Sequence, residues 1–342
     1  MLKCITSLSV FRMTHFAPVI SALVTLILTL FLTLNKTGMI QDVPNERSLH
    51  TEPIPRIGGI GLMAGVLFGW TMLFQSWAWW IVLPVLGLFA LSLVDDVRNL
   101  SPRIRLIGHF IAAMVVLWGA GVDILWLLPV LLFIVWMTNL YNFMDGSDGL
   151  AGGMTFFGFN FYGIAGLMNG NDTLAMMSFS VSAAGLAFLF FNFHPAKVFM
   201  GDAGSIPLGF LAAAFGVWGW QQGYWPFWFP ILIFSPFVAD ATMTLLKRVR
   251  RGENLAQAHR SHYYQKLVQM GWGHRNTAIA EYVLMFLAGI SALWGVGLDV
   301  QGQGNMLAWW GAIYLGLSMW VDRRWSKYES SKETPAKNTG DA

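Results

Sequence analysis

Residues 16–34 read FAPVISALVTLILTLFLTL, a stretch without a charged side chain. A helix needs about 20 apolar residues to cross the hydrocarbon core of a bilayer, so this stretch is long enough to span one. Further stretches of similar character follow along the chain: 58–74, 78–94, 106–119, 124–140, 153–168, 174–193, 206–221, 226–246, 276–298 and 306–321. The sequence therefore predicts an all-α, polytopic integral membrane protein with about 11 transmembrane helices.

The composition of the 342-residue chain agrees with this class of protein. Hydrophobic residues make up 56% of the chain and charged residues only 11%, whereas soluble domains carry about 25% charged residues. The net charge of +3 is too small to indicate a nucleic-acid partner, so we expect none. We expect one transmembrane domain over residues 1–321, followed by a polar, disordered cytoplasmic tail over 322–342.

Basic residues are distributed unevenly between the two alternating sets of connecting loops. One set contains 19 of the 21 Lys and Arg residues, and the loops of the other set contain none. An excess of Lys and Arg in short loops marks the cytoplasmic side, so the C-terminus is predicted to lie inside and the N-terminus outside. The basic set comprises 35–57, 95–105, 141–152, 194–205, 247–275 and 322–342.

Five aspartates lie at the ends of predicted helices, all on the basic side: Asp95, Asp96, Asp145, Asp148 and Asp202. One such residue alone could simply mark the point where a helix enters water. Adjacent carboxylates such as Asp95 and Asp96 repel each other unless a cation is near. Magnesium prefers one or two carboxylates together with waters and substrate phosphates. Five aspartates on one side therefore predict a magnesium and phosphate site, with Mn²⁺ as the alternative metal.

Histidine and arginine gather in the same set of loops. The segment AHRSHYYQ, residues 258–265, carries His259, Arg260 and His262, which are common phosphate partners. The first inner loop adds Arg47, His50 and Arg56, although its Pro and Gly residues suit a plain turn equally well. Asp240, inside the ninth predicted span, is either a functional acid or a structural hydrogen-bonding partner of a neighbouring helix.

Four ordered motifs resemble the polyprenyl-phosphate N-acetylhexosamine-1-phosphate transferase family. They are PRIGG at 55–59, the acidic pair at 95–96, NLYNFMDGSDG at 139–149 and FMGDAGS at 199–205, followed by the histidine loop. The resemblance runs from about Pro44 to Gly273. It implies a fold of ten or eleven helices around a cytoplasmic cleft, in which a UDP-sugar meets a lipid phosphate.

The resemblance also implies roles for individual residues. Asp202 is similar to the family's principal magnesium ligand, and Asp95 and Asp96 to the pair that activates the lipid phosphate or helps to hold the metal. Substrate-binding candidates are Asn139, Asn142, Asp145, Asp148, Asn192, Phe199, Arg56 and His259, with Phe199 placed like the aromatic that stacks on uracil. Arg260 and His262 complete the catalytic candidates.

The implied reaction transfers an N-acetylhexosamine-1-phosphate from a UDP-sugar to undecaprenyl phosphate, releasing UMP at the bacterial inner membrane. Attack is either direct or passes through an aspartyl-phosphate enzyme. The HRSHYYQ form is similar to the O-antigen-initiating branch, which favours a 6-deoxy sugar such as N-acetylfucosamine or N-acetylquinovosamine. A homodimer is left open as the assembly state.

Two other classes of membrane protein share some of these features. A secondary transporter would also have many spans and an intramembrane acid such as Asp240, but its coupling residues lie near the bilayer midplane. A CDP-alcohol phosphotransferase also binds magnesium through aspartates at the membrane boundary. Its motif contains an Ala-Arg pair that does not follow DGLAGG here.

Overall fold

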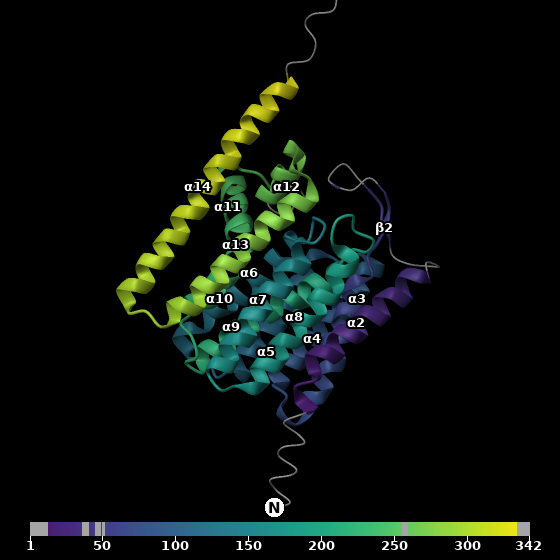
Figure 1. Cartoon of the computed structure of the whole chain (residues 1–342), viewed down its shortest axis with the longest axis vertical. Coiled ribbons are helices and arrows are strands. Elements are labelled where there is room, and N and C mark those ends of the chain that lie inside the picture. The colour runs from purple at the N-terminus through teal and green to yellow at the C-terminus, as the bar shows by residue number, and fades with distance from the viewer. Residues whose placement is uncertain (1–12, 36–40, 45–48, 50–51, 255–258, 334–342) are drawn as a thin grey trace, which may run out of the picture.

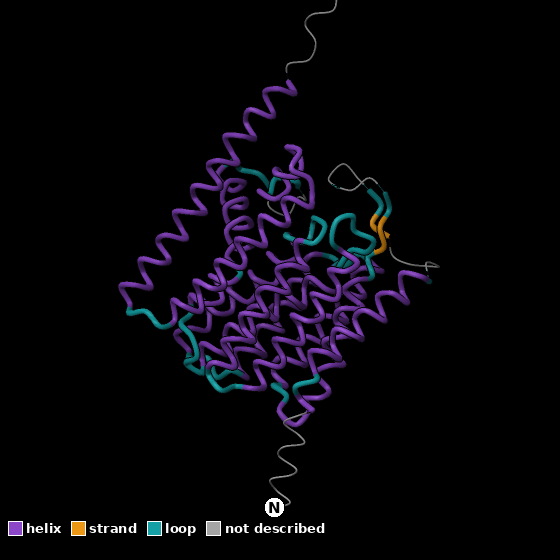
Figure 2. The backbone as a smooth tube through the Cα atoms, in the orientation of Figure 1, coloured by secondary structure: helices purple, strands orange, loops and turns teal. Residues whose placement is uncertain are grey.

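The computed structural model describes residues 13–35, 41–44, 49, 52–254 and 259–333. Arg47 and His50 lie outside the described residues. The described chain is helical almost throughout, with one short pair of strands (Figure 2). Eight of its helices are long and apolar enough to cross a membrane. The stretches predicted to span the membrane are helical, although 226–246 is divided between two helices, and the all-α, polytopic prediction is confirmed.

The first part of the chain contains α2 (Ala17–Leu34), β1 (Gln41–Asp42), β2 (Ile54–Pro55), α3 (Gly58–Trp70), η1 (Thr71–Ser76), α4 (Trp79–Arg98), α5 (Pro102–Gly119), η2 (Ile124–Trp126), α6 (Leu127–Phe143) and α7 (Leu150–Met168). The second part contains α8 (Asp172–Asn192), α9 (Asp202–Gln221), α10 (Trp228–Ile233), α11 (Ser235–Arg250), α12 (Tyr263–Leu267), the π-helical turn η3 (Val268–Trp272), α13 (Gly273–Val296) and α14 (Val300–Glu333). Strands β1 and β2 pair antiparallel, with Gln41 opposite Pro55.

Small residues let α2 and α3 pack closely. The buried side chains of Ser21, Thr25 and Thr29 recur every four residues on α2 and therefore share one face of that helix. They meet glycines of α3: a Cβ added to Gly61 would lie 2.1 Å from Oγ1 of Thr29, and one added to Gly65 would lie 2.1 Å from Oγ1 of Thr25. Such close contact is how membrane helices associate, because lipid is as apolar as their side chains.

Helix α9 lies at the centre of the bundle. It packs against α3, α4, α6 and α7, and nearly all of its residues are buried. Its first residue is Asp202, preceded by Gly201 at φ +69°, a left-handed backbone conformation that favours glycine. The most enclosed helix therefore begins at one of the predicted site residues.

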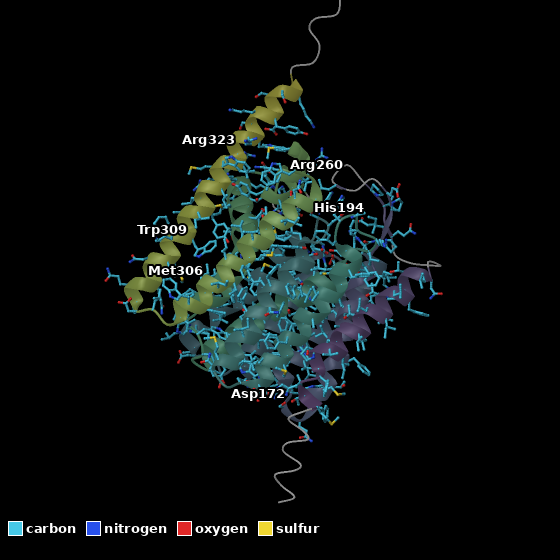
Figure 3. All side chains as sticks on the ribbon, viewed as in Figure 1. Asp172, His194, Arg260, Met306, Trp309 and Arg323 are labelled. Carbon is cyan, nitrogen blue, oxygen red and sulfur yellow. The ribbon has the colours of Figure 1, made fainter. Side chains whose placement is uncertain are left out.

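The loops that were predicted to be cytoplasmic gather at one end of the molecule. The labelled residues His194, Arg260 and Arg323 lie toward one end and Asp172 lies at the other (Figure 3). The strand pair and α12 also lie at the first end (Figure 1). The folded chain thus brings together the loops that carry most of the basic residues and all five aspartates.

The predicted disordered tail is wrong for residues 322–333, which continue helix α14 to Glu333. This helix runs along one flank of the bundle and extends beyond it (Figure 1). Asp322 pairs with Lys247 and with Lys266, whose Nζ lies 3.2 Å from its Oδ1. These partners are far away in the sequence, so composition alone could not reveal them. Residues 334–342 lie outside the described part of the chain.

Candidate active site

Helices α4, α5 and α9 bring three charged side chains together. Nη1 of Arg105 lies 3.2 Å from Oδ2 of Asp95 and 3.3 Å from Oδ2 of Asp202. The backbone N–H of Leu100 donates to the other oxygen of Asp95, 2.6 Å away. One guanidinium therefore bridges two carboxylates that come from different helices. Both aspartates were predicted site residues, whereas Arg105 was not among them.

Asp96 faces the same start of α9 but is paired differently. Its Oδ2 accepts a hydrogen bond from the backbone N–H of Ala203, 3.3 Å away. Within the described residues, Asp96 forms no ion pair. The two adjacent aspartates are therefore not equivalent, because Asp95 has a guanidinium partner and Asp96 does not.

Asp145 extends this acidic cluster from the loop between α6 and α7. It accepts a hydrogen bond from the backbone N–H of Gly201. Burial raises the pKa of Asp145 well above its usual range, Arg56 opposes this effect, and the nearby Asp202 adds to it. Arg56, which directly follows β2, also lies 3.4 Å from Asp42 of β1. The strand pair thus holds a second guanidinium near the acids.

The acidic cluster can accommodate a divalent cation that is also held by other ligands. Among the residues that the structure describes, no three His, Cys, Asp or Glu side chains are arranged to hold a metal by themselves. Two carboxylates, those of Asp95 and Asp202, already reach one shared cation, the guanidinium of Arg105. Magnesium needs only one or two carboxylates when waters and phosphates supply the rest. The residues present therefore fit magnesium bound together with a phosphate substrate.

The two asparagines of α6 are already engaged within the protein. Oδ1 of Asn142 accepts a hydrogen bond from the Ser205 hydroxyl of α9, 2.8 Å away. Nδ2 of Asn139 donates to the carbonyl of Val135 and lies 3.2 Å from Nδ1 of the buried His109. Asn142 therefore joins α6 to the start of α9, and Asn139 joins α6 to α5.

Asp148 and two histidines form a second polar cluster. Nδ1 of His194 lies 2.7 Å from Oδ2 of Asp148, and the backbone N–H of Ala196 donates to the same oxygen at 3.1 Å. His274 lies 2.8 Å from the Ser147 hydroxyl, and its ring stacks on that of His194 at 5.5 Å. Neither His194 nor His274 was a predicted site residue, because each stands alone in its own segment.

Asn192 and Phe199 both help to hold the loops of the site. Asn192 accepts from the backbone N–H of Gly149 at 3.0 Å and donates to the carbonyl of Val198 at 2.9 Å. The backbone of Phe199 bonds to Pro55 and Gly58, which joins its segment to the start of α3. Because Asn192 is buried and both ends of its amide are used, its position supports a structural role rather than direct substrate binding.

Asp240 anchors the histidine loop, which is a structural role of the kind predicted as one of two alternatives for it. Its Oδ1 lies 3.0 Å from Nδ1 of His262 and accepts the backbone N–H of Tyr263, also at 3.0 Å. Its Oδ2 accepts the backbone N–H of Tyr264 at 2.9 Å. The carboxylate therefore satisfies amides that the start of α12 would otherwise leave unpaired. His262 in turn stacks on His259, with ring centres 4.9 Å apart.

The two tyrosines of this loop are both buried in the protein. Tyr264 is fully buried, and its hydroxyl donates to the carbonyl of Phe143 at 3.2 Å. Tyr263 is also buried and contacts Lys247 and Asp322. A 6-deoxy sugar carries a methyl group that an exposed aromatic ring could pack against, and neither buried tyrosine offers such a ring here. Arg260 is exposed, and among the described residues only its backbone carbonyl is hydrogen-bonded, to Gln269 at 3.1 Å.

The acidic cluster, the Asp148 cluster and the histidine loop each contact one segment, residues 142–149. Asp145 joins the acidic cluster, Ser147 and Asp148 meet the two histidines, and Phe143 contacts Tyr264 of the histidine loop. Gly149 follows at φ +75°, and its carbonyl accepts the hydroxyl of Tyr282 at 2.6 Å. This segment therefore brings carboxylates, guanidinium groups and imidazoles together, a combination suited to binding a metal and anionic phosphates.

Known proteins with similar sequences indicate the family to which this chain belongs. The family model described as glycosyl transferase family 4 matches residues 78–219. A probable undecaprenyl-phosphate N-acetylglucosaminyl 1-phosphate transferase of Bacillus subtilis is 30% identical, covering 74% of this chain and 76% of its own length. An undecaprenyl-phosphate alpha-N-acetylglucosaminyl 1-phosphate transferase of Yersinia pestis is 27% identical over 85% of this chain and 86% of its own.

A phospho-N-acetylmuramoyl-pentapeptide-transferase of Thermoanaerobacter is 26% identical, covering 68% of this chain and 81% of its own length. The relatives are named for different sugar donors, so what they share is the family and its type of reaction. The matched part of the chain includes Asp95, Asp145 and Asp202. The chain is a membrane-embedded phosphotransferase and belongs to the polyprenyl-phosphate N-acetylhexosamine-1-phosphate transferases of glycosyl transferase family 4.

Proposed function

We propose that this enzyme transfers an N-acetylhexosamine-1-phosphate from a UDP-sugar to undecaprenyl phosphate, and that it does so at the cytoplasmic face of a bacterial inner membrane. The observation that carries the proposal is the convergence of Asp95, Asp96, Asp145 and Asp202 with two arginines at one end of the bundle. Two phosphate-bearing substrates must meet there, which requires positive charge between them. The names of the relatives supply the polyprenyl phosphate acceptor.

In the proposed reaction, an oxygen of the lipid phosphate forms a bond to the β-phosphorus of the UDP-sugar. The bond between that phosphorus and the bridging oxygen breaks, and UMP leaves with the electron pair. Bound magnesium would neutralise the pyrophosphate charge, and Asp95 and Asp202 are the residues that would hold it. Arg105 and Arg56 provide further positive charge beside the transferring group.

Asp96 is the better candidate of the acidic pair for the general base. Its neighbour Asp95 shares the guanidinium of Arg105 with Asp202, whereas Asp96 has no ion-pair partner among the described residues. A carboxylate without a cation partner retains more affinity for a proton. The lipid phosphate has a second pKa of about 6, so transferring its proton to Asp96 needs little driving force.

The proposal also concerns which sugar is transferred and which polymer the product starts. Two of the relatives are named for N-acetylglucosamine, and the buried tyrosines give no reason to favour a 6-deoxy sugar here. We therefore place UDP-N-acetylglucosamine first and a UDP-6-deoxy-N-acetylhexosamine second. Either product would start a cell-envelope polysaccharide such as O-antigen.

The test is transfer of radiolabel from UDP-sugars to undecaprenyl phosphate by the purified full-length chain with magnesium. We expect labelled lipid from UDP-N-acetylglucosamine, none without the acceptor, and loss of transfer in Asp96→Asn. The control is Asp172→Asn, which changes an aspartate at the opposite end of the molecule (Figure 3). Absence of labelled lipid from every UDP-N-acetylhexosamine would overturn the proposal. Cysteines placed beside Asp145 should react only with reagents applied from the cytoplasm.

A further inference from the structure

Two adjoining cavities lie between α14 and the helices beside it. The first has a volume of about 580 Å³ and is lined by Met270, Trp272, Trp320, Arg323, Arg324, Lys327 and Tyr328. The second is a narrow slot of about 120 Å³ between α11, α13 and α14, and Trp272 and Trp320 line it as well. Because both tryptophans border both cavities, the slot and the larger cavity are neighbours. We call the larger one the basic pocket.

The basic pocket carries three cations and no acid in its lining. Arg323, Arg324 and Lys327 are all exposed. In the part of the chain that the structure describes, none of the three forms an ion pair with an acidic side chain. The guanidinium of Arg324 lies over the ring of Trp320, 5.3 Å from its centre. Unpaired cations on one wall of a cavity favour an anionic ligand.

The slot beside it is mainly apolar. Its lining includes Met243, Leu267, Leu284, Leu317 and Val321. It also contains polar groups, including Glu281 and the hydroxyl of Tyr314, and the latter is bonded to Ser235 at 2.7 Å. An apolar slot next to a basic pocket matches a molecule with a hydrocarbon chain and an anionic head. A free phosphate would use the pocket alone.

The two cavities lie where the anionic head of a membrane lipid would be expected. Arg323 lies toward the same end of the molecule as Arg260 and His194 (Figure 3), where the basic loops gather. Tryptophan rings favour the level of lipid headgroups, and lysine and arginine near that level attract anionic lipids. Trp272 and Trp320 contact each other edge to face at 5.6 Å, between the slot and the basic pocket.

We propose that the basic pocket and the slot together form a binding site for an anionic phospholipid of the membrane. The phosphate lies against Arg323, Arg324 and Lys327, and one acyl chain enters the slot between α13 and α14. The site is separate from the acidic cluster, because Ala280, Glu281 and Leu284 of α13 line the slot whereas Tyr282 bonds to Gly149 beside the active site.

The lipid site adjoins the histidine loop through α12. Tyr263 lines the slot and contacts Asp322 of α14, and Asp322 also pairs with Lys266 of α12. An acyl chain that occupies the slot therefore contacts α12, the helix whose first residue donates a hydrogen bond to Asp240. The bound lipid would stabilise the position of α14 against that loop.

The test uses the full-length chain in nanodiscs of phosphatidylcholine mixed with phosphatidylglycerol, and counts the lipids retained in native mass spectrometry. We expect the wild type to retain phosphatidylglycerol preferentially. The variant Arg323→Gln/Arg324→Gln/Lys327→Gln should lose this preference by at least about tenfold, because three headgroup contacts are removed. The matched control Arg250→Gln/Arg251→Gln/Lys332→Gln changes three cations that do not line the pocket, and it should retain the preference.

A second variant tests the slot. Ala280→Trp should fill it and reduce retention of phosphatidylglycerol, while inorganic phosphate should not compete with the lipid in the wild type. Melting curves of each variant show whether it is folded. Unchanged retention in the triple glutamine variant would overturn the proposal, as would displacement of the lipid by phosphate. A tenfold rise in the KM for undecaprenyl phosphate in that variant would also overturn it, because the site would then belong to the substrate.

Discussion

Nδ1 of His262 lies 3.0 Å from Oδ1 of Asp240, so an acid of one helix orients the imidazole at the start of another. The same carboxylate accepts the backbone N–H groups of Tyr263 and Tyr264. Asp240 has only 6% of its surface exposed, and its pairing is therefore shielded from water. This position explains why an aspartate stands within a helix that is otherwise part of the membrane bundle.

Asp240→Ala should destabilise the histidine loop and strongly reduce transfer. It leaves two buried N–H groups and an imidazole without an acceptor, at about 1–3 kcal/mol for each unsatisfied group. Asp240→Asn keeps one acceptor oxygen, so its transfer rate should lie between those of the wild type and the alanine variant. Transfer rates and protease sensitivity after Arg251 measure the effect. A fully active alanine variant with a protected loop would show that the anchor is dispensable.

Asp202→Asn should abolish turnover while membrane insertion and melting temperature stay close to the wild type. Losing a metal–carboxylate contact in the transition state should reduce the rate by at least about a thousandfold. The comparison is with Asp172→Asn, which begins α8 at the other end of the bundle. If Asp202→Asn transfers sugar phosphate within tenfold of the wild-type rate, Asp202 does not hold the metal.

Arg105→Gln should have opposite effects on metal binding and on turnover. Removing the guanidinium between Asp95 and Asp202 leaves both carboxylates free for magnesium, so the concentration giving half-maximal activity should fall. The maximal rate should also fall, because one positive charge beside the phosphates is lost. Titrating activity with magnesium separates the two effects. Arg103→Gln, two residues away on the same helix, is the control and should change neither value.

His259 should remain uncharged at neutral pH. Burial, together with the neighbouring His262 and Arg248, lowers the pKa of His259 from 6.5 to about 4. Below about pH 6.5 the unfolded chain binds a proton at His259 that the folded protein binds only near pH 4. The free energy of unfolding therefore decreases as the pH falls from about 6.5 toward 4. His259→Gln should flatten the decrease in melting temperature between pH 7.5 and 5, and it should keep the shape of the activity profile above pH 6. An identical decrease in both proteins would contradict this assignment.

Tyr263→His/Tyr264→His should lower the melting temperature but leave the choice of sugar unchanged. Both rings are buried in protein contacts, so the double substitution disturbs packing and hydrogen bonds rather than a sugar pocket. The measurement is the ratio of kcat/KM for UDP-N-acetylglucosamine and a UDP-6-deoxy sugar, which should change less than about threefold. A larger change toward N-acetylglucosamine would restore a role for the tyrosines in sugar choice.

The sequence allowed the membrane fold and the gathering of the acids to be predicted because both depend on features visible along the chain. Apolar length predicts the helices, and the alternation of basic loops predicts that Asp95, Asp145 and Asp202 lie on one side. Side-chain partners could not be predicted in this way. An amide such as that of Asn192 can bind a ligand or join two loops, and only the position of Gly149 and Val198 around it decides between them.

Side-chain partners also could not be predicted for the histidine loop and for the last helix. Tyr264 stands in the segment AHRSHYYQ beside predicted site residues, but its ring is enclosed by protein. Residues 322–333 are polar enough to suggest disorder. However, Asp322 forms ion pairs with two lysines that precede it by more than fifty residues. Long-range ion pairs of this kind leave no periodic signal in the sequence.

The enclosure of α9 has a consequence for biogenesis. A helix bordered by α3, α4, α6 and α7 has almost no surface for lipid, so it reaches its final surroundings only when those neighbours assemble around it. Helices α3 to α7 are synthesised first and α9 enters among them afterwards. Because Asp202 is the first residue of α9, the acidic cluster is completed late. A ribosome-bound chain that ends before α9 therefore has Asp95, Asp96 and Asp145 but lacks Asp202, so its acidic cluster is incomplete.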